Sequence, residues 1–209
     1  DATYSWTEFH VLTDIAAGKK NLLSLDTVLN KIEADFVKGA HRLYFTSNHD
    51  ENSWNKADYA TMPGASHAPF AVFTQTYHRT MPLIYSGQEE PVLRPLAFFE
   101  KDSIEFKKYE RANFYAALLK LRKSNSAFSE SANFKRLTVN QPGQVMAYER
   151  TNGKDQVVVV LNLSNQPQSI TVEGIDATTN FEELFTKQKK QGLHALQLPA
   201  WGYQVLVKK

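Results

Sequence analysis

The sequence predicts an α/β region followed by an all-β region, and two observations lead to this expectation. Up to about residue 124, short apolar strands alternate with amphipathic helices, as they do in parallel α/β sheets. After that point the chain consists of short strands separated by turn residues, which is typical of an antiparallel β module. We therefore predict two domains, at residues 1–127 and 128–209.

The composition is that of an ordinary folded chain. Of its 209 residues, 42% are hydrophobic and 22% are charged, and the net charge of +2 provides no field that would attract nucleic acid. The absence of cysteine excludes disulfides and thiolate nucleophiles. Apolar runs such as Val157–Leu161 are far shorter than the roughly 20 residues that span a bilayer. We expect neither a nucleic-acid partner nor a membrane span.

Apolar spacing predicts the helices of the first region. Residues 6–36 show helical spacing on two stripes, and Gly18 lies between them where a helix would end. Residues 67–77 suit another helix, and residues 108–123 form the most regular amphipathic pattern of the chain. In this last helix the expected inward residues are Phe114, Leu118 and Leu121, and the expected outward residues are Glu110, Lys120 and Arg122.

Short apolar runs predict the strands. In the first region these are His41–Ser47 and Pro82–Gly87. In the second region they are residues 144–150, 156–163, 168–172, 195–198 and 203–207. The pair Asn152-Gly153 between two of them is a strong hairpin signal.

Polar residues follow both strands of the first region. Asn48-His49-Asp50-Glu51-Asn52 comes after one strand and Gln88-Glu89-Glu90 after the other. In parallel α/β folds such positions converge on a ligand at the carboxyl ends of the strands. An imidazole beside a carboxylate suits hydrogen bonding to a polyol, or the placement of a negative charge near a cationic transition state. The alternative is a structural turn, because Asn and Asp also cap helices and bond their own backbone.

Other kinds of site are less well supported. A metal at His49, Asp50 and Glu51 is disfavoured because adjacent residues of a strand point apart, so we expect no metal here. No Gly-x-Ser-x-Gly motif or phosphate-binding loop is present in the sequence. Trp54 lies beside the polar residues and could stack on a sugar ring, whereas Trp201, among apolar neighbours, fits a core position.

Four segments, in order, resemble the α-amylase family of glycoside hydrolases. Phe45-Thr46-Ser47-Asn48-His49-Asp50-Glu51-Asn52 is similar to the family's fourth conserved region, at the end of barrel strand seven. Met81–Glu89 resembles strand eight, and Leu121-Arg122-Lys123 with Asn125 and Ala127 resembles the last barrel helix. Leu198-Pro199-Ala200-Trp201-Gly202-Tyr203 is similar to the end of the small β domain that follows the barrel.

The resemblance implies a partial (β/α)8 TIM barrel, strands six to eight, followed by a C-terminal antiparallel β-sandwich domain. Asp1-Ala2-Thr3-Tyr4 would end strand six, so the chain would continue from a longer one. Three barrel strands cannot close. We therefore expect a missing N-terminal portion or an oligomer to cover the open edge of the barrel.

The resemblance also implies a function, namely retaining hydrolysis of α-glucosidic bonds in starch-type glucans. It makes Asp50 the catalytic stabiliser of the transition state, with His49, Asn48, Glu51 and Trp54 as substrate-binding residues. The nucleophile and the general acid belong to strands four and five, so the isolated chain is expected to be inactive. Secretion or surface placement, and calcium in the longer enzyme, are further expectations from the family.

Two alternatives remain open. The longer enzyme could be a transglycosidase, because the residues present here are shared among those activities. The chain could instead be a non-catalytic carbohydrate-binding or assembly module, in which aromatic residues such as Trp54 stack on a glucan or malto-oligosaccharide.

Overall fold

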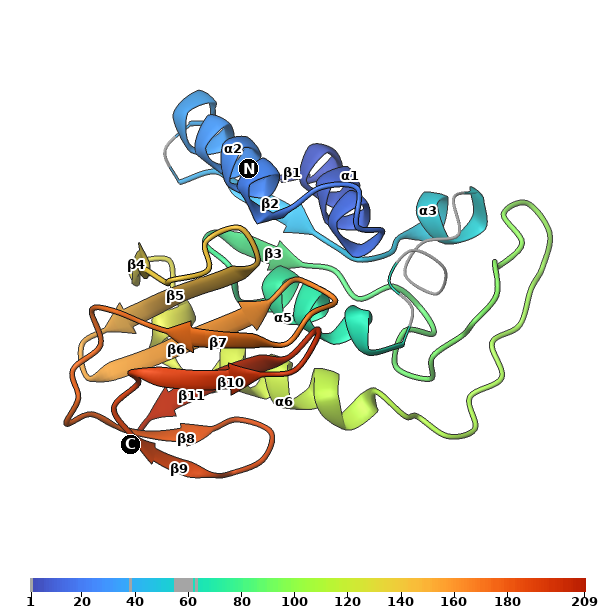
Figure 1. Cartoon of the computed structure of the whole chain (residues 1–209). Helices are drawn as coiled ribbons and strands as arrows, with labels where there is room; N and C mark the ends of the chain where they lie inside the picture. Colours follow the sequence, from blue (N-terminus) through green and yellow to red (C-terminus); the bar gives the residue numbers. More distant parts are fainter. Residues whose placement is uncertain (1, 38, 55–61, 63) are drawn as a thin grey trace.

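The computed structural model describes residues 2–37, 39–54, 62 and 64–209. A parallel sheet with its helices forms the N-terminal part, and an antiparallel β region forms the C-terminal part (Figure 1). Within the described residues, no helix has the length and apolar character needed to cross a membrane.

The parallel sheet has three strands in the order β1-β2-β3, namely β1 (Ala2–Tyr4), β2 (His41–Tyr44) and β3 (Thr80–Pro82). The connection from β1 to β2 carries α1 (Trp6–Ala16) and α2 (Leu22–Asp35). The connection from β2 to β3 carries α3 (His49–Trp54), a 3-10 turn at Gly64–Ser66, and α5 (His67–Thr76). After β3 come α6 (Ala112–Ser124) and a 3-10 turn at Ser126–Phe128. The predicted alternation of strands and helices is confirmed.

Local sequence signals account for the helix boundaries. Gly18, at φ +71°, ends α1 as predicted, since a left-handed residue after the last turn is accessible to glycine without strain. The side chain of Asn21 then accepts a hydrogen bond from the backbone N–H of Leu23 and caps α2. The predicted helix at residues 67–77 matches α5 closely.

Three boundaries and two side chains differ from the prediction. The first strand is His41–Tyr44 rather than His41–Ser47, and Glu110, expected on the outer face of the last helix, lies before that helix begins. The second strand is Thr80–Pro82 rather than Pro82–Gly87, because parallel pairing with β2 stops at Pro82. The last helix begins at Ala112 rather than residue 108, because Tyr109 has φ +51°, which a helix cannot accommodate. Arg122, expected outward, is half-buried and donates to the carbonyls of Gln75 and Thr80.

The C-terminal part contains a six-stranded antiparallel sheet in the order β4-β5-β6-β11-β8-β9 and a two-stranded sheet, β10-β7. The large sheet comprises β4 (Asn133–Arg136), β5 (Val145–Asn152), β6 (Asp155–Asn162), β8 (Asn180–Glu183), β9 (Lys189–Gln191) and β11 (Tyr203–Lys208). The small one comprises β7 (Gln168–Thr171) and β10 (Ala195–Leu198). The predicted hairpin is confirmed, because Asn152 pairs with Asp155 across a two-residue turn.

Both faces of the six-stranded sheet are buried. On β6, Val157, Val159 and Leu161 share a cluster with residues of α5 and α6, including Phe70, Phe73 and Leu118. The intervening Val158 and Val160 share another cluster with Ile170 of β7 and with Leu196 and Leu198 of β10. Because side chains alternate along a strand, a strand buried on both faces reads as a continuous apolar run. The sheet therefore lies between the helices and the small β10-β7 sheet.

A matched pair of substitutions on α6 tests this packing. Leu118 is fully buried and Leu119 is 47% exposed. Leu118→Ala and Leu119→Ala are therefore the same substitution at a buried and at an exposed position of one helix. We expect Leu118→Ala to lower the free energy of unfolding by about 2–5 kcal/mol, through lost burial and the cavity left behind. Leu119→Ala should change it by less than about 0.5 kcal/mol. Chemical denaturation measures both, and equal losses would contradict the packing of α6 on the sheet.

Candidate functional site

The candidate site lies at the carboxyl end of β2. The chain leaves the strand and soon enters the short helix α3 (Figure 1). The linking stretch, Phe45–Asn48, is buried, and α3 carries the remaining residues predicted for the site. His49, Asp50, Glu51 and Trp54 therefore lie on one short helix of about one and a half turns. Parallel sheets present functional side chains at this end of their strands.

Two asparagines hold α3 in place. Asn48 is buried, and its Oδ1 accepts a hydrogen bond of 2.8 Å from the backbone N–H of Glu51, which caps the helix. Asn52 is also buried, and its Oδ1 accepts a hydrogen bond of 2.8 Å from the backbone N–H of Leu96 in the loop after β3. The capping role that the sequence left open for this motif therefore belongs to Asn48.

His49 and Asp50 are the accessible polar pair. Their side chains are 55% and 40% exposed, and His49 Nε2 lies 3.5 Å from Asp50 Oδ2. Glu51, in contrast, is buried. An exposed carboxylate beside an exposed imidazole on a fixed helix can accept and donate hydrogen bonds to a bound hydroxylated ligand.

An exposed aromatic cluster adjoins this pair. Phe98 stacks on His49 with a centroid separation of 6.2 Å, and Trp54 lies 5.3 Å from Phe98 and 6.1 Å from Phe99. Phe99 is 81% exposed, which is unusual for a large apolar side chain. The sequence analysis singled out Trp54 but missed Phe98 and Phe99. The available signal was the pair of adjacent aromatic residues in a stretch for which no helix or strand was predicted.

The second polar motif, Gln88-Glu89-Glu90, helps build the framework. The Gln88 amide donates to Thr46 Oγ1 at 2.8 Å and accepts from the backbone N–H of Tyr85, which joins the ends of β2 and β3. The Glu90 carboxylate accepts hydrogen bonds from three backbone N–H groups, those of residues 107–109. The Tyr109 N–H contributes most to lowering the Glu90 pKa. These bonds fix both ends of the loop that carries Phe98 and Phe99.

An ion pair shapes the middle of the same loop. Arg94 binds both carboxylate oxygens of Asp102, at 2.7 and 2.9 Å, and Asp102 also accepts from the backbone N–H groups of Ala97 and Ser103. The Arg94 hydrogen bond is the largest of several effects that hold the Asp102 pKa well below its usual range. Asp102 therefore remains an anion that stabilises the loop conformation.

Two polar atoms at the start of the site have no partner in the described part of the chain. Ser47 Oγ and Asn48 Nδ2 are buried, and neither forms a hydrogen bond with a described residue. Such groups cost free energy when they are left unsatisfied. Over the same described residues, no three His, Asp or Glu side chains come together in a way that could hold a metal ion.

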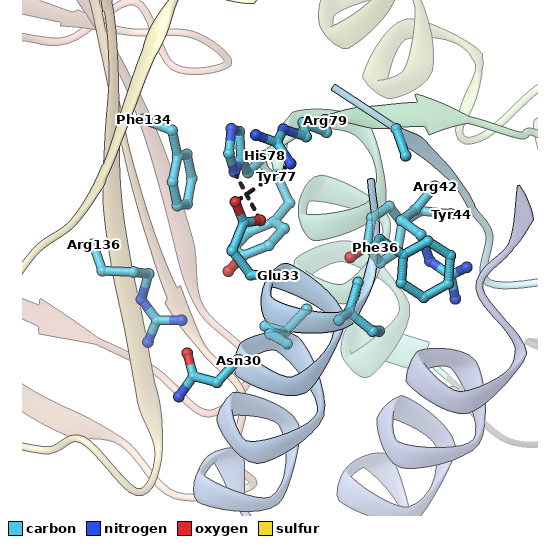
Figure 2. Close-up of a pocket in the computed structure, with 13 residues that line it drawn as sticks. Asn30, Glu33, Phe36, Arg42, Tyr44, Tyr77, His78, Arg79, Phe134 and Arg136 are labelled. Atoms are coloured by element: carbon cyan, nitrogen blue, oxygen red, sulfur yellow. Dashed lines mark ion pairs between the residues drawn. The ribbon is translucent and has the colours of Figure 1, made fainter. Parts of the chain in front are cut away.

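A cavity of about 280 Å³ lies away from these residues, between α2 and β4 (Figure 2). Its charged lining is internally paired. Arg42 binds Glu8 in a bidentate pair, Arg136 Nη1 lies 2.7 Å from Asp26 Oδ1, and Arg79 Nη1 lies 3.3 Å from Glu33 Oε1, whose other oxygen is 3.8 Å from His78 Nδ1. Because each guanidinium has its own carboxylate, we interpret this cavity as part of the contact between α2 and the β region.

His78 has a strongly altered environment in this cavity. Its ring stacks on Phe134 with a centroid separation of 4.7 Å and an interplanar angle of 4°. Burial is the main cause, and the Arg79 guanidinium a lesser one, of a fall in the His78 pKa from 6.5 to about 4. The imidazole is therefore neutral in the folded protein at neutral pH.

Comparison with known proteins adds to this geometry. Residues 134–205 match the family described as Maltogenic Amylase, C-terminal domain. The α-amylase MalA of Haloarcula japonica is 26% identical over 193 residues, which cover 88% of this chain and 27% of that protein. These matches relate the chain to the α-amylase family. The family resemblance read from the sequence is thereby confirmed.

Solved α-amylase family structures share the fold. A maltogenic α-amylase, AmyB of Thermotoga neapolitana, superposes with a TM-score of 0.83 at 18% identity, over 100% of this chain and 50% of that one. A cyclomaltodextrinase superposes with a TM-score of 0.76 at 20% identity, over 100% of this chain and 37% of that one. The chain thus spans half or less of these relatives, and the C-terminal β domain predicted from the sequence fits the structure.

The lowered pKa of His78 predicts a pH dependence of stability. Between pH 6.5 and about 4 the unfolded chain binds a proton at His78 that the folded chain does not, so stability falls on acidification and rises with pH. The side chain is 26% exposed, so after allowance for solvent screening the effect is about 1–2 kcal/mol. We expect His78→Asn to reduce the stability difference between pH 7 and about pH 4.5 by this amount.

Urea unfolding at the two pH values measures the difference. His10→Asn, at an exposed histidine on α1, is the matched control and should leave the pH dependence unchanged. An unaltered pH dependence in His78→Asn would show that His78 does not carry the effect.

Proposed function

We propose that this chain is the C-terminal part of a glycoside hydrolase of the α-amylase family that acts on α-glucosidic bonds of starch-type glucans by a retaining mechanism. In this proposal residues 1–127 supply strands six to eight of a (β/α)8 barrel, and residues 128–209 form the C-terminal β domain. The parallel order β1-β2-β3 with intervening helices supports the barrel assignment. The observation that carries the proposal is the exposed His49 and Asp50 pair at the carboxyl end of the middle strand.

In the proposed reaction Asp50 stabilises the transition state. A fixed carboxylate near a sugar ring that develops positive charge interacts more strongly with the transition state than with the ground state. His49 donates a hydrogen bond to a hydroxyl of the same ring. Asn48, just before α3, and Glu51, on its buried side, are further substrate-binding residues in this proposal. Trp54 supplies an apolar surface for a neighbouring sugar. The Asn48 cap, together with the bond from the Leu96 N–H to Asn52 Oδ1, keeps α3 in the orientation this role requires.

The rest of the barrel would complete the site. Ser47 Oγ and Asn48 Nδ2, which have no hydrogen-bond partner among the described residues, support this, because neighbouring strands could satisfy them. All three residues of β1 are exposed, which is consistent with an edge that another strand covers. The nucleophile and the general acid would come from that missing portion, and an oligomer is the alternative cover. Transglycosylation in place of hydrolysis would use the same residues of this chain.

The role of Asp50 can be tested in the full-length protein. We expect Asp50→Asn to lower kcat on a soluble malto-oligosaccharide by at least about 10²-fold, because charge stabilisation of the transition state is lost. The fold should be retained, since the side chain is partly exposed at 40%. Asp35→Asn, the same change at an exposed site on α2, is the control and should keep normal turnover. Near-normal turnover in Asp50→Asn would refute the assignment.

The isolated chain provides a separate test. The purified chain of 209 residues, with its intact mass verified, should not hydrolyse a malto-oligosaccharide, since it holds only one of the three proposed catalytic carboxylates. Turnover that is abolished by Asp50→Asn would mean that Glu51, Glu89 or Glu90 supplies the missing groups. The barrel assignment would then be wrong.

The exposed cluster of Trp54, Phe98 and Phe99 favours a second candidate function, a non-catalytic glucan-binding module. Aromatic faces stack on sugar rings without any need for catalytic carboxylates. Titration with a malto-oligosaccharide, followed by tryptophan fluorescence, distinguishes the two functions. Binding that survives substitution of both His49 and Asp50 favours the module.

A further inference from the structure

We propose that the chain has a second binding site, for a neutral saccharide, in a cavity of about 320 Å³ between the α1–α2 turn and the loops of the β region next to Trp201. None of its lining residues belongs to α3 or to the loop with Phe98 and Phe99. The site rests on its own chemistry and does not depend on the activity proposed for His49 and Asp50. Its volume suits a ligand of about one or two sugar rings.

The lining combines one indole with many amides. Besides Trp201, five of the lining residues carry a primary amide, namely Asn21, Gln144, Asn165, Gln166 and Gln168. A primary amide both donates and accepts hydrogen bonds, so it matches hydroxyl groups, which do the same. In the described chain Gln144 uses neither function of its amide, and Asn21 uses only Oδ1, in its bond to Leu23. Hydrogen-bonding capacity is therefore available to a ligand.

The charge of the cavity indicates a neutral ligand. Lys20 is the only charged residue among the described lining, and its Nζ lies 2.8 Å from Asp14 Oδ2. An anion would have to compete with Asp14 for this one exposed lysine. A purely apolar ligand would leave the amides without partners, at a cost in free energy. A saccharide meets both conditions, because it has no charge and carries hydroxyls around an apolar ring face.

The wall that carries Trp201 is rigid before any ligand binds. Asn162 is fully buried, and its Nδ2 donates to the carbonyls of Gln166 and Pro199 at 2.8 and 2.7 Å. Its Oδ1 accepts from the hydroxyl of Ser164 at 2.7 Å. One side chain thus joins the loop after β6 to the turn before β11. Because these loops are already ordered, less conformational entropy is lost when a ligand binds.

Trp201 itself has an unusual backbone. Its φ is +57°, a region that bulky residues rarely occupy, and its N–H donates to the Ser164 carbonyl at 2.9 Å. Gly202 follows without room for a side chain, since an added Cβ would lie 2.7 Å from Pro199 Cδ. The indole packs against Phe70 with a centroid separation of 5.8 Å. The structure therefore holds the indole in a fixed position at the cavity, where it can stack on a sugar ring.

Backbone hydrogen bonds also hold the opposite wall of the cavity in place. The backbone N–H of Leu22, at the start of α2, donates to the Gly143 carbonyl at 3.0 Å. The N–H of Leu163 donates to the Gln144 carbonyl at 2.9 Å. The cavity is thus bounded by the end of α1, the α1–α2 turn and the β region, and a backbone hydrogen bond joins the start of α2 to Gly143 on the other wall.

The test uses the indole N–H signals of the ¹⁵N-labelled chain, which distinguish Trp6, Trp54 and Trp201 in NMR spectra. Titration with maltose should shift the Trp201 signal saturably, and Asp50→Asn should leave this shift unchanged. Binding at the first site would instead move the Trp54 signal, so the two proposals fail separately. No shift of the Trp201 signal at the highest soluble maltose concentration overturns the second site.

Two variants and a second probe complete the test. Trp201→Ala should weaken maltose binding, measured by calorimetry in an Asp50→Asn, Trp54→Ala background, by at least tenfold. Gln144→Leu removes an amide of the wall without altering the strained turn, and it should weaken binding while the melting temperature is retained. Unchanged affinity in folded Gln144→Leu contradicts the role of the amides. Inorganic phosphate should leave the Trp201 signal unshifted, and a saturable shift by phosphate in place of maltose would overturn the neutral ligand.

Discussion

The burial of β6 on both faces is the constraint on which the rest of the structure depends. Each residue from Val157 to Leu161 is fully buried, with alternate side chains directed to the helices and to the small β10-β7 sheet. A strand with two apolar faces requires cover on both sides, since each exposed valine or leucine would lose roughly 1.5–3 kcal/mol of burial. Helices α5 and α6 are therefore needed by the β region as much as by the parallel sheet.

Two arginines, the buried Arg150 and the half-buried Arg122, complete this contact where apolar packing ends. Arg150 on β5 donates to the carbonyls of Ala127 and Tyr77, and Arg122 on α6 donates to the carbonyls of Gln75 and Thr80. Carbonyl groups at the ends of helices lack intrahelical partners, so a guanidinium that reaches several of them satisfies groups that burial would leave unpaired. Burial lowers the pKa of Arg122 to about 10, so it stays charged at neutral pH. These bonds fix α5 between β3 and the large sheet.

The sequence predicted those parts of the fold that depend on local patterns. Helical spacing gave α1, α2 and α5, and Asn152-Gly153 gave the β5–β6 hairpin, because each signal acts over a few residues. It missed β4, β8 and β9, which are polar strands toward the edges of the sheet that pair through backbone hydrogen bonds rather than an apolar pattern. Arg122 was predicted to face outward because amphipathic spacing carries no information about carbonyl groups in other elements.

The sequence likewise predicted only part of the candidate site. The polar motif after β2 was visible because it follows an apolar strand, and the structure has His49 and Asp50 at the surface there. Phe98 and Phe99 belong to a loop closed by Glu90 and Asp102, some 40 residues further along the chain, and the Leu96 N–H of that loop bonds to Asn52. Contacts at that separation follow from the tertiary fold, so the sequence showed two adjacent aromatic residues but not their place beside His49 and Trp54.

The cluster around β6 also bears on how such a protein can evolve. It contains residues of α1, α2, α5 and α6 together with residues of β5, β6 and β11, so it extends across residues 127 and 128. Recombination could therefore not transfer the C-terminal β region to another protein without exposing the apolar face that these helices cover. Substitutions on the shared face of the sheet must be matched on the helices, and we expect the two parts to be inherited together and to diverge in step.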